Sequence, residues 1–99
     1  MDISAVVEQY IDSVAYAVGY DISNTDDRNY LSNLISAGVQ DLCDAGVNES
    51  TITTNKLTLT TLIIFVTDNL NMSPGQFSMS SMYVYNVTKL RLIKDESES

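Results

Sequence analysis

The chain has 99 residues, a formal net charge of −8, no histidine and one cysteine. This length allows one domain that buries roughly 65% of its unfolded surface, so association with further copies would add stability. The composition excludes an internal disulfide and a Cys-His catalytic pair. The acidic balance argues against sequence-reading DNA binding, which needs cations to displace counterions from phosphates.

The charges are unevenly distributed along the chain. Residues 1–55 hold nine acidic side chains and one basic one, a net charge of −8. Residues 56–94 hold one acidic and four basic side chains (+3), and residues 95–99 carry −3. No signal-peptide pattern opens the chain, and its longest apolar run, residues 62–66, is far below the roughly 20 residues that span a bilayer. We therefore expect a cytosolic protein with no membrane partner.

The first predicted element is a helix over residues 2–18. Its apolar residues recur at the three- and four-residue steps of one helical face. Asp2 or Ser4 can cap its first turn, and Gly19 ends it. The series consists of Ile3, Val6, Val7, Tyr10, Ile11, Val14, Ala15 and Val18.

The central element is a predicted helix over residues 26–46. Asn24 or Thr25 can cap it, two aspartates occupy its first turn, and Gly46 ends it. Gly38 lies in the middle of its apolar stripe, where glycine costs about 1 kcal/mol against alanine. We therefore expect a close helix approach at Gly38, with another backbone nearby. Cys43 is expected to be a small apolar residue beside this stripe.

Residues 20–25 are predicted to be a short polar connection, and residues 47–55 a loop. Oxygen-bearing side chains alternate from Asp21 to Asn29 as in a calcium-binding loop. Such a loop needs glycine at its sixth position and glutamate at its twelfth, and this chain has Asp26 and Ser32 there. We therefore predict no metal site.

Residues 56–70 carry conflicting signals. The threonines and the β-branched run favour a strand, whereas the leucine spacing and a possible cap at Asn55 favour a helix buried on most sides. We predict a helix, followed by a turn at residues 71–77 that contains Pro74-Gly75.

Residues 78–94 are also predicted to be helical, although they include the strand-like Tyr83-Val84-Tyr85. Ser78 or Ser80 can cap the helix, and its basic C-terminal end suits the helix dipole. Residues 95–99 contain no apolar residue and are expected to be a disordered tail. The predicted fold is therefore all-α, with about four helices in one domain over residues 1–94.

The predicted core brings together the apolar faces of the first three helices. Its members are Val7, Tyr10, Val14, Leu31, Leu34, Ile35, Leu42, Leu62, Ile63 and Val66. No glycine-rich phosphate loop is present, and the acidic residues fall on polar helix faces or caps. We therefore expect no catalytic residue, no cofactor and no enzyme.

The order of these parts resembles the head-tail connector (head-completion adaptor) family of tailed bacteriophages. That family has an acid pair opening a second helix of the form YL..LI.AA..YI...G, a third apolar helix, and a final helix ending in Leu-Arg. The matching residues are Asp26-Asp27, Tyr30-Leu31, residues 34–38 (LISAG), Leu42, Gly46, residues 59–70 and Leu90-Arg91. The chain departs from the family in its threonine-rich third segment and in Lys89, where many members have glutamine.

The resemblance implies a structural protein of the virion neck, assembled in the host bacterial cytoplasm. It implies a homo-oligomeric ring, typically dodecameric, that docks beneath the portal protein and presents a surface to the stopper or tail-completion protein. DNA would pass through the lumen without specific binding, which an acidic wall would favour. The resemblance places the final helix against the portal, and the only basic cluster of the chain lies there. The predicted portal interface is Lys89, Leu90, Arg91, Ile93 and Lys94.

Two other classes fit a small acidic helical chain. A DNA-mimic inhibitor would bind a DNA-handling enzyme and compete with DNA. An acyl carrier protein would need its modified serine at the start of the second helix, whereas Asp12-Ser13-Val14 lies inside the first.

Overall fold

The computed structural model describes residues 1–72 and 79–93, which form helices and no strand. The helices are α1 (Ile3–Val18), α2 (Thr25–Asp44), α3 (Glu49–Thr54), α4 (Lys56–Asn71) and α5 (Ser81–Arg91). The predicted all-α fold is therefore confirmed. Lys94, the tail at residues 95–99 and most of the turn at residues 71–77 lie outside the described residues. Across the described ranges, every helix lacks the length and apolarity that crossing a membrane requires.

The first two helices begin and end within two residues of their predicted bounds. The Asp2 carboxylate accepts a hydrogen bond from the Ala5 amide, and the Asn24 side chain accepts one from the Asp27 amide. Gly19 closes α1 at φ +80°, and Gly46 follows α2 at φ +93°. Only glycine adopts these left-handed conformations readily, which explains why both helices stop there.

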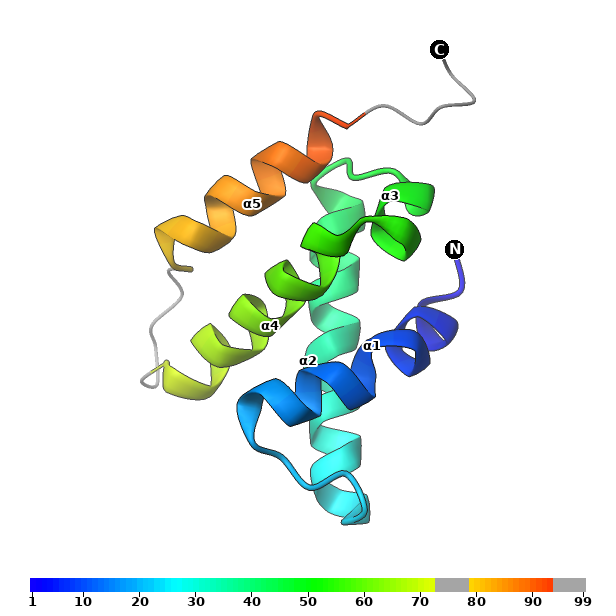
Figure 1. The fold of residues 1–99 in the computed structure, drawn as a ribbon, viewed down its shortest axis with the longest axis vertical. Coiled ribbons are helices and arrows are strands. Elements are labelled where there is room, and N and C mark those ends of the chain that lie inside the picture. Colours follow the sequence, from blue (N-terminus) through cyan, green and yellow to red (C-terminus); the bar gives the residue numbers. More distant parts are fainter. Residues whose placement is uncertain (73–78, 94–99) are drawn as a thin grey trace.

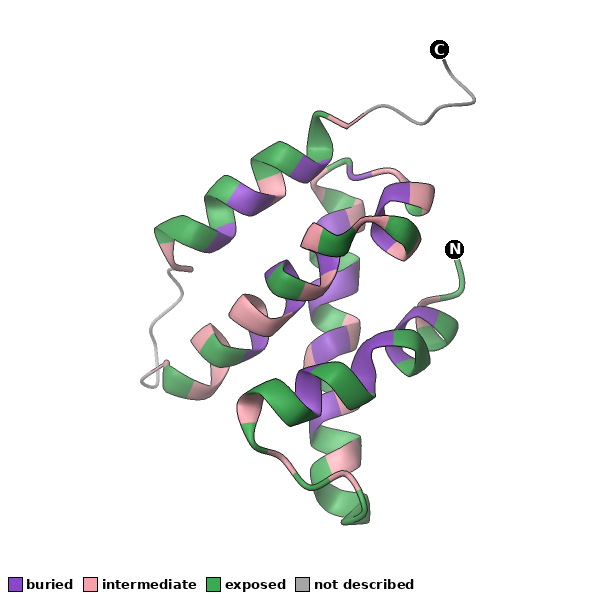
Figure 2. Cartoon of the chain, viewed as in Figure 1, coloured by how far each residue is buried: buried purple, intermediate pink, exposed green. Residues whose placement is uncertain are grey.

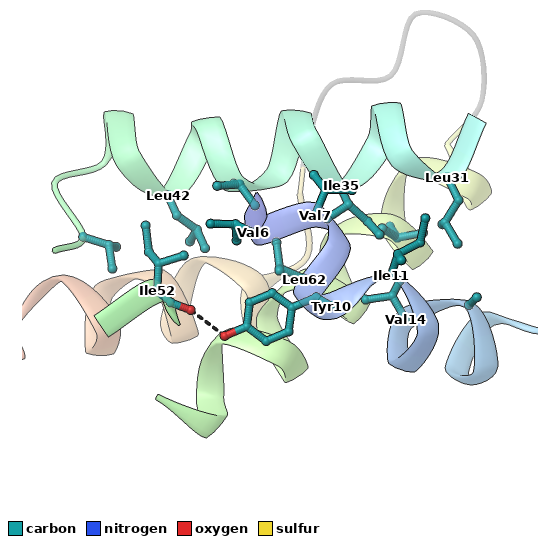
Figure 3. Close-up of a cluster of buried hydrophobic side chains, with 14 of the residues drawn as sticks. Val6, Val7, Tyr10, Ile11, Val14, Leu31, Ile35, Leu42, Ile52 and Leu62 are labelled. Atoms are coloured by element: carbon teal, nitrogen blue, oxygen red, sulfur yellow. Dashed lines mark hydrogen bonds between the residues drawn. The ribbon is translucent and has the colours of Figure 1, made fainter. Parts of the chain in front are cut away.

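The segment predicted to be a loop at residues 47–55 contains a helix, so that prediction was wrong. The short helix α3 carries the buried residues Thr51 and Ile52. Six residues make fewer than two turns, which is too short for a helical period to show in a sequence. The helix is held by tertiary contact, because Ile52 enters the core and its carbonyl accepts a hydrogen bond from the buried Tyr10 hydroxyl (Figure 3).

Helix α4 forms despite the β-branched composition of its sequence. The Asn55 side chain caps it by accepting from the Leu57 amide at 2.9 Å. Two buried threonines satisfy their hydroxyls without leaving the helix: Thr61 donates to the Leu57 carbonyl at 2.7 Å and Thr58 to the Thr51 carbonyl at 3.1 Å. Both hydroxyls are therefore hydrogen-bonded, and burying these threonines in a helix leaves neither hydroxyl unsatisfied. Packing against the neighbouring helices outweighs the strand propensity of the segment.

The helices are arranged around α4. It lies against α2, and α1 and α5 flank it on opposite sides (Figure 1). The buried faces converge between α1, α2 and α4, while the outer sides of α1 and α5 are largely exposed (Figure 2). The final helix is thus an edge element, which leaves one of its sides open to solvent.

Most of the predicted core residues are buried. Leu34 and Ile63 differ: they are half-buried and pack against the edge of the core. The buried members are Val7, Tyr10, Val14, Leu31, Ile35, Leu42, Leu62 and Val66.

Close packing does occur at Gly38, but the partner is not the backbone that we expected. A Cβ atom there would lie 3.0 Å from Leu62 Cδ2 and 3.0 Å from Phe65 Cδ1. The missing side chain therefore makes room for two large side chains of α4.

Candidate interaction surface

The start of α5 is fixed by two polar contacts. The Ser80 hydroxyl accepts from the Tyr83 amide at 3.3 Å, which caps the helix as predicted. The Asp68 carboxylate of α4 accepts from the Ser80 amide at 3.0 Å. A negative charge close to a helix N-terminus is favourable, so Asp68 both anchors and stabilises α5.

The inner side of α5 is buried through Tyr83, Asn86 and Leu90. The Tyr83 ring packs against Phe65 of α4, with the ring centroids 5.6 Å apart. Its hydroxyl donates a hydrogen bond to the Asp41 carboxylate of α2. One tyrosine therefore connects α5 to both of the neighbouring long helices.

The environment of Tyr83 keeps its hydroxyl protonated. Burial raises the pKa of Tyr83 well above its ordinary value, and the hydrogen bond to Asp41 and the charge of that carboxylate raise it further. The neutral hydroxyl is thus the stable donor at the α2–α5 contact.

The far end of α5 lies beside the turn between α2 and α3. The Asn48 side-chain amide donates to the Ile93 carbonyl at 3.3 Å. A Cβ placed on Gly46 would lie 3.8 Å from the Cγ and Cδ atoms of Arg91. The aliphatic part of Arg91 is therefore directed toward this turn, although the residue as a whole is exposed.

The predicted portal residues do not form one surface. Leu90 is fully buried, because it belongs to the inner side of α5 and fills the core; its place in the predicted interface was wrong. Lys89 and Arg91 are both exposed, but two residues span about 200° of a helix, so they lie on opposite flanks. Ile93 is half-buried beyond the helix end, and Lys94 lies outside the described residues.

A surface that sequence reasoning missed runs along the exposed flank of α5 that carries Lys89. We call it the α5 outer face, and it consists of Met82, Tyr85, Lys89 and Leu92. Their spacing places them within about 80° around the helix axis. Met82 is 57% exposed, Tyr85 60% and Leu92 71%. The Lys89 ammonium lies 5.1 Å from the Tyr85 ring centroid, a cation-π contact that holds the cation over this apolar surface.

The α1 outer face provides the opposite charge. We define it by Ala5, Asp12 and Tyr16, which are exposed and fall within about 40° around the axis. Tyr16 is 92% exposed, the largest exposure among the large apolar side chains described. Glu8 lies on the flank of this face and forms an ion pair with Arg28 at 3.0 Å.

Other features of the described residues offer less chemistry. A shallow groove of about 240 Å³ between α1 and α2 is lined by serines, Asn33, Val7 and Glu8. In residues 1–72 and 79–93, no three His, Cys, Asp or Glu side chains gather as a metal would require. Cys43 is half-buried, and burial raises the pKa of its thiol.

Comparisons of this chain with family models, with curated proteins and with solved structures found no match. The two outer faces are therefore interpreted from their own chemistry. Exposed apolar side chains beside single charges are typical of protein–protein contacts.

Proposed function

We propose that this protein is a structural adaptor of a phage neck, which forms a ring beneath the portal and extends the DNA channel toward the stopper or tail. The observation that carries the proposal is the final helix: a basic, apolar and exposed element at the edge of an otherwise acidic all-α domain. The resemblance of the helix order to head-tail connectors gives this feature its interpretation. The proposal assigns no catalytic residue.

The portal contact is proposed at the C-terminal end of α5. Leu90 is excluded by its burial, and Lys89 is directed over Tyr85 on the other flank. The exposed Arg91 and the half-buried Ile93 remain, with Lys94 beyond the described residues. An arginine suits this role because it binds carboxylates in a bidentate manner while its stem packs on apolar surface.

Native mass spectrometry of the full chain with the portal protein from the same genome tests the function. We expect a portal complex for the wild type and its loss for Arg91→Glu, because like charges across an interface are strongly rejected. Lys56→Glu makes the same charge change on a different helix, at the exposed first residue of α4, and should retain binding. A wild-type chain that does not bind portal refutes the adaptor function, whereas binding by a folded Arg91→Glu variant refutes only this contact.

A DNA-mimic inhibitor is the second candidate, favoured by two pairs of exposed carboxylates, one at each end of α2. Asp26, Asp27, Asp41 and Asp44 are all exposed. A mimic would bind a DNA-handling enzyme in competition with duplex DNA, and an adaptor would not. Pull-down from host lysate with and without excess DNA distinguishes the two functions.

A further inference from the structure

We propose that the α5 outer face binds the α1 outer face of a second copy of this chain. This inference rests on the proposed ring, and it names the two surfaces that meet. Its occupant is a second copy because the complementary chemistry is found on the same molecule.

The charges of the two helices are complementary. Helix α5 contains Lys89 and Arg91 and no acidic residue, whereas α1 contains Glu8 and Asp12 and no basic residue. Glu8 already forms an ion pair with Arg28. Asp12 is therefore the carboxylate available at the centre of the α1 outer face. Lys89 is the cation at the centre of the α5 outer face, and it pairs with Asp12 of the second copy.

The apolar parts of the two faces also match. Tyr85 and Leu92 stand exposed on either side of Lys89, and Tyr16 stands exposed one turn from Asp12. Packing the two helices antiparallel places Tyr16 beside Tyr85 and buries aromatic and aliphatic surface around one ion pair. Such an arrangement, with apolar anchors beside a charge pair, provides both affinity and orientation.

The positions of the helices permit this contact without rearrangement. Helices α1 and α5 lie on opposite sides of α4 (Figure 1). One copy can therefore present its α5 to one neighbour and its α1 to another at the same time.

Sedimentation equilibrium of the full chain tests the proposal through charge reversal. The wild type should self-associate, and Lys89→Glu or Asp12→Lys alone should weaken association at least tenfold. The double variant Lys89→Glu/Asp12→Lys should restore it, because the pair is then reversed. Lys56→Glu is the matched control, and circular dichroism melting checks that each variant is folded. A monomeric wild type, or an assembly that neither single reversal weakens, overturns the proposal; a portal-binding chain then keeps its proposed function.

Cross-linking tests which faces meet, even if a charge variant folds poorly. In a Cys43→Ser background, Tyr16→Cys and Tyr85→Cys proteins are prepared separately. We expect an intermolecular disulfide when they are mixed and little in either protein alone, since each face binds the other and not itself. Equal cross-linking in the separate samples indicates a symmetric contact and refutes the pairing.

Discussion

Ile35 and Leu34 are neighbours on α2, yet only Ile35 is fully removed from solvent. Ile35→Ala should lower the free energy of unfolding by about 2–5 kcal/mol, because it deletes fully buried methyl groups and leaves a cavity. Leu34→Ala should cost about half as much, since its half-buried side chain has less area to lose. Urea titration followed by circular dichroism measures both. Equal losses of stability would mean that α2 is rotated about its axis, so that Leu34 is buried as fully as Ile35.

The raised pKa of Tyr83 predicts that the folded protein becomes less stable at alkaline pH. An unfolded tyrosine loses its proton at a pH of about 10. In the folded chain the pKa of Tyr83 is higher, so Tyr83 keeps its proton above that pH. The stabilisation is therefore complete below about pH 10 and is lost as the pH rises further, because the unfolded state then binds fewer protons. Tyr83→Phe should cost about 0.5–2 kcal/mol at neutral pH and reduce the alkaline loss.

Tyr30→Phe is the control for this experiment, since Tyr30 is exposed and belongs to neither outer face. Thermal melts between pH 7 and 11 compare the variants. Tyr10 is also buried and has a raised pKa, so part of the alkaline loss should remain in Tyr83→Phe. An unchanged pH profile in that variant would show that Tyr83 is not the group responsible.

At the scale of the helices, the attachment of α5 depends on Asp68. Asp68→Ala removes the acceptor of the Ser80 amide and a favourable charge at the N-terminus of α5. We expect the first turn of α5 to open locally, with faster hydrogen exchange at the Tyr83 and Val84 amides and little change in α1. Asp26→Ala is the matched control, because Asp26 is exposed and lies on another helix, in the first turn of α2. Unaltered exchange in Asp68→Ala would mean that burial of Tyr83 alone holds the helix in place.

The sequence predicts the long helices well, because their caps and apolar periods agree. Asp2, Asn24, Asn55 and Ser80 were each candidate caps, and each accepts the hydrogen bond that a cap requires. The helix α3 was missed because its stability comes from the tertiary burial of Ile52 and not from a local pattern.

The interaction surface was less predictable for a geometric reason. Lys89, Leu90 and Arg91 are adjacent in sequence, and their charges suggested one cluster. Successive residues of a helix point about 100° apart, so these three side chains lie on two flanks and in the core. The spacing of Met82, Tyr85, Lys89 and Leu92 does indicate a shared face, but their burial could not be known before α5 was placed against α4.

At the scale of the whole molecule, the proposed self-association should depend on salt. One ion pair at its centre is screened as the ionic strength rises, and the Debye length falls from about 10 Å at 0.1 M to about 3 Å at 1 M. Association should therefore weaken with added sodium chloride without being abolished, because the apolar contacts of Tyr16, Tyr85 and Leu92 remain. Sedimentation at 0.05, 0.15 and 0.5 M salt measures this. An association constant that does not change with salt would show that the Lys89–Asp12 ion pair does not contribute to the contact.

The placement of α1 and α5 on opposite sides of α4 also gives an assembly a polarity. Any open row of copies ends in one unused acidic helix and one unused basic helix, so its two ends differ and each can accept another subunit. Growth stops only when the last α5 meets the first α1, and that closing contact is intramolecular and therefore entropically cheap. Incomplete rows should consequently be scarce, with monomers and closed assemblies as the main species.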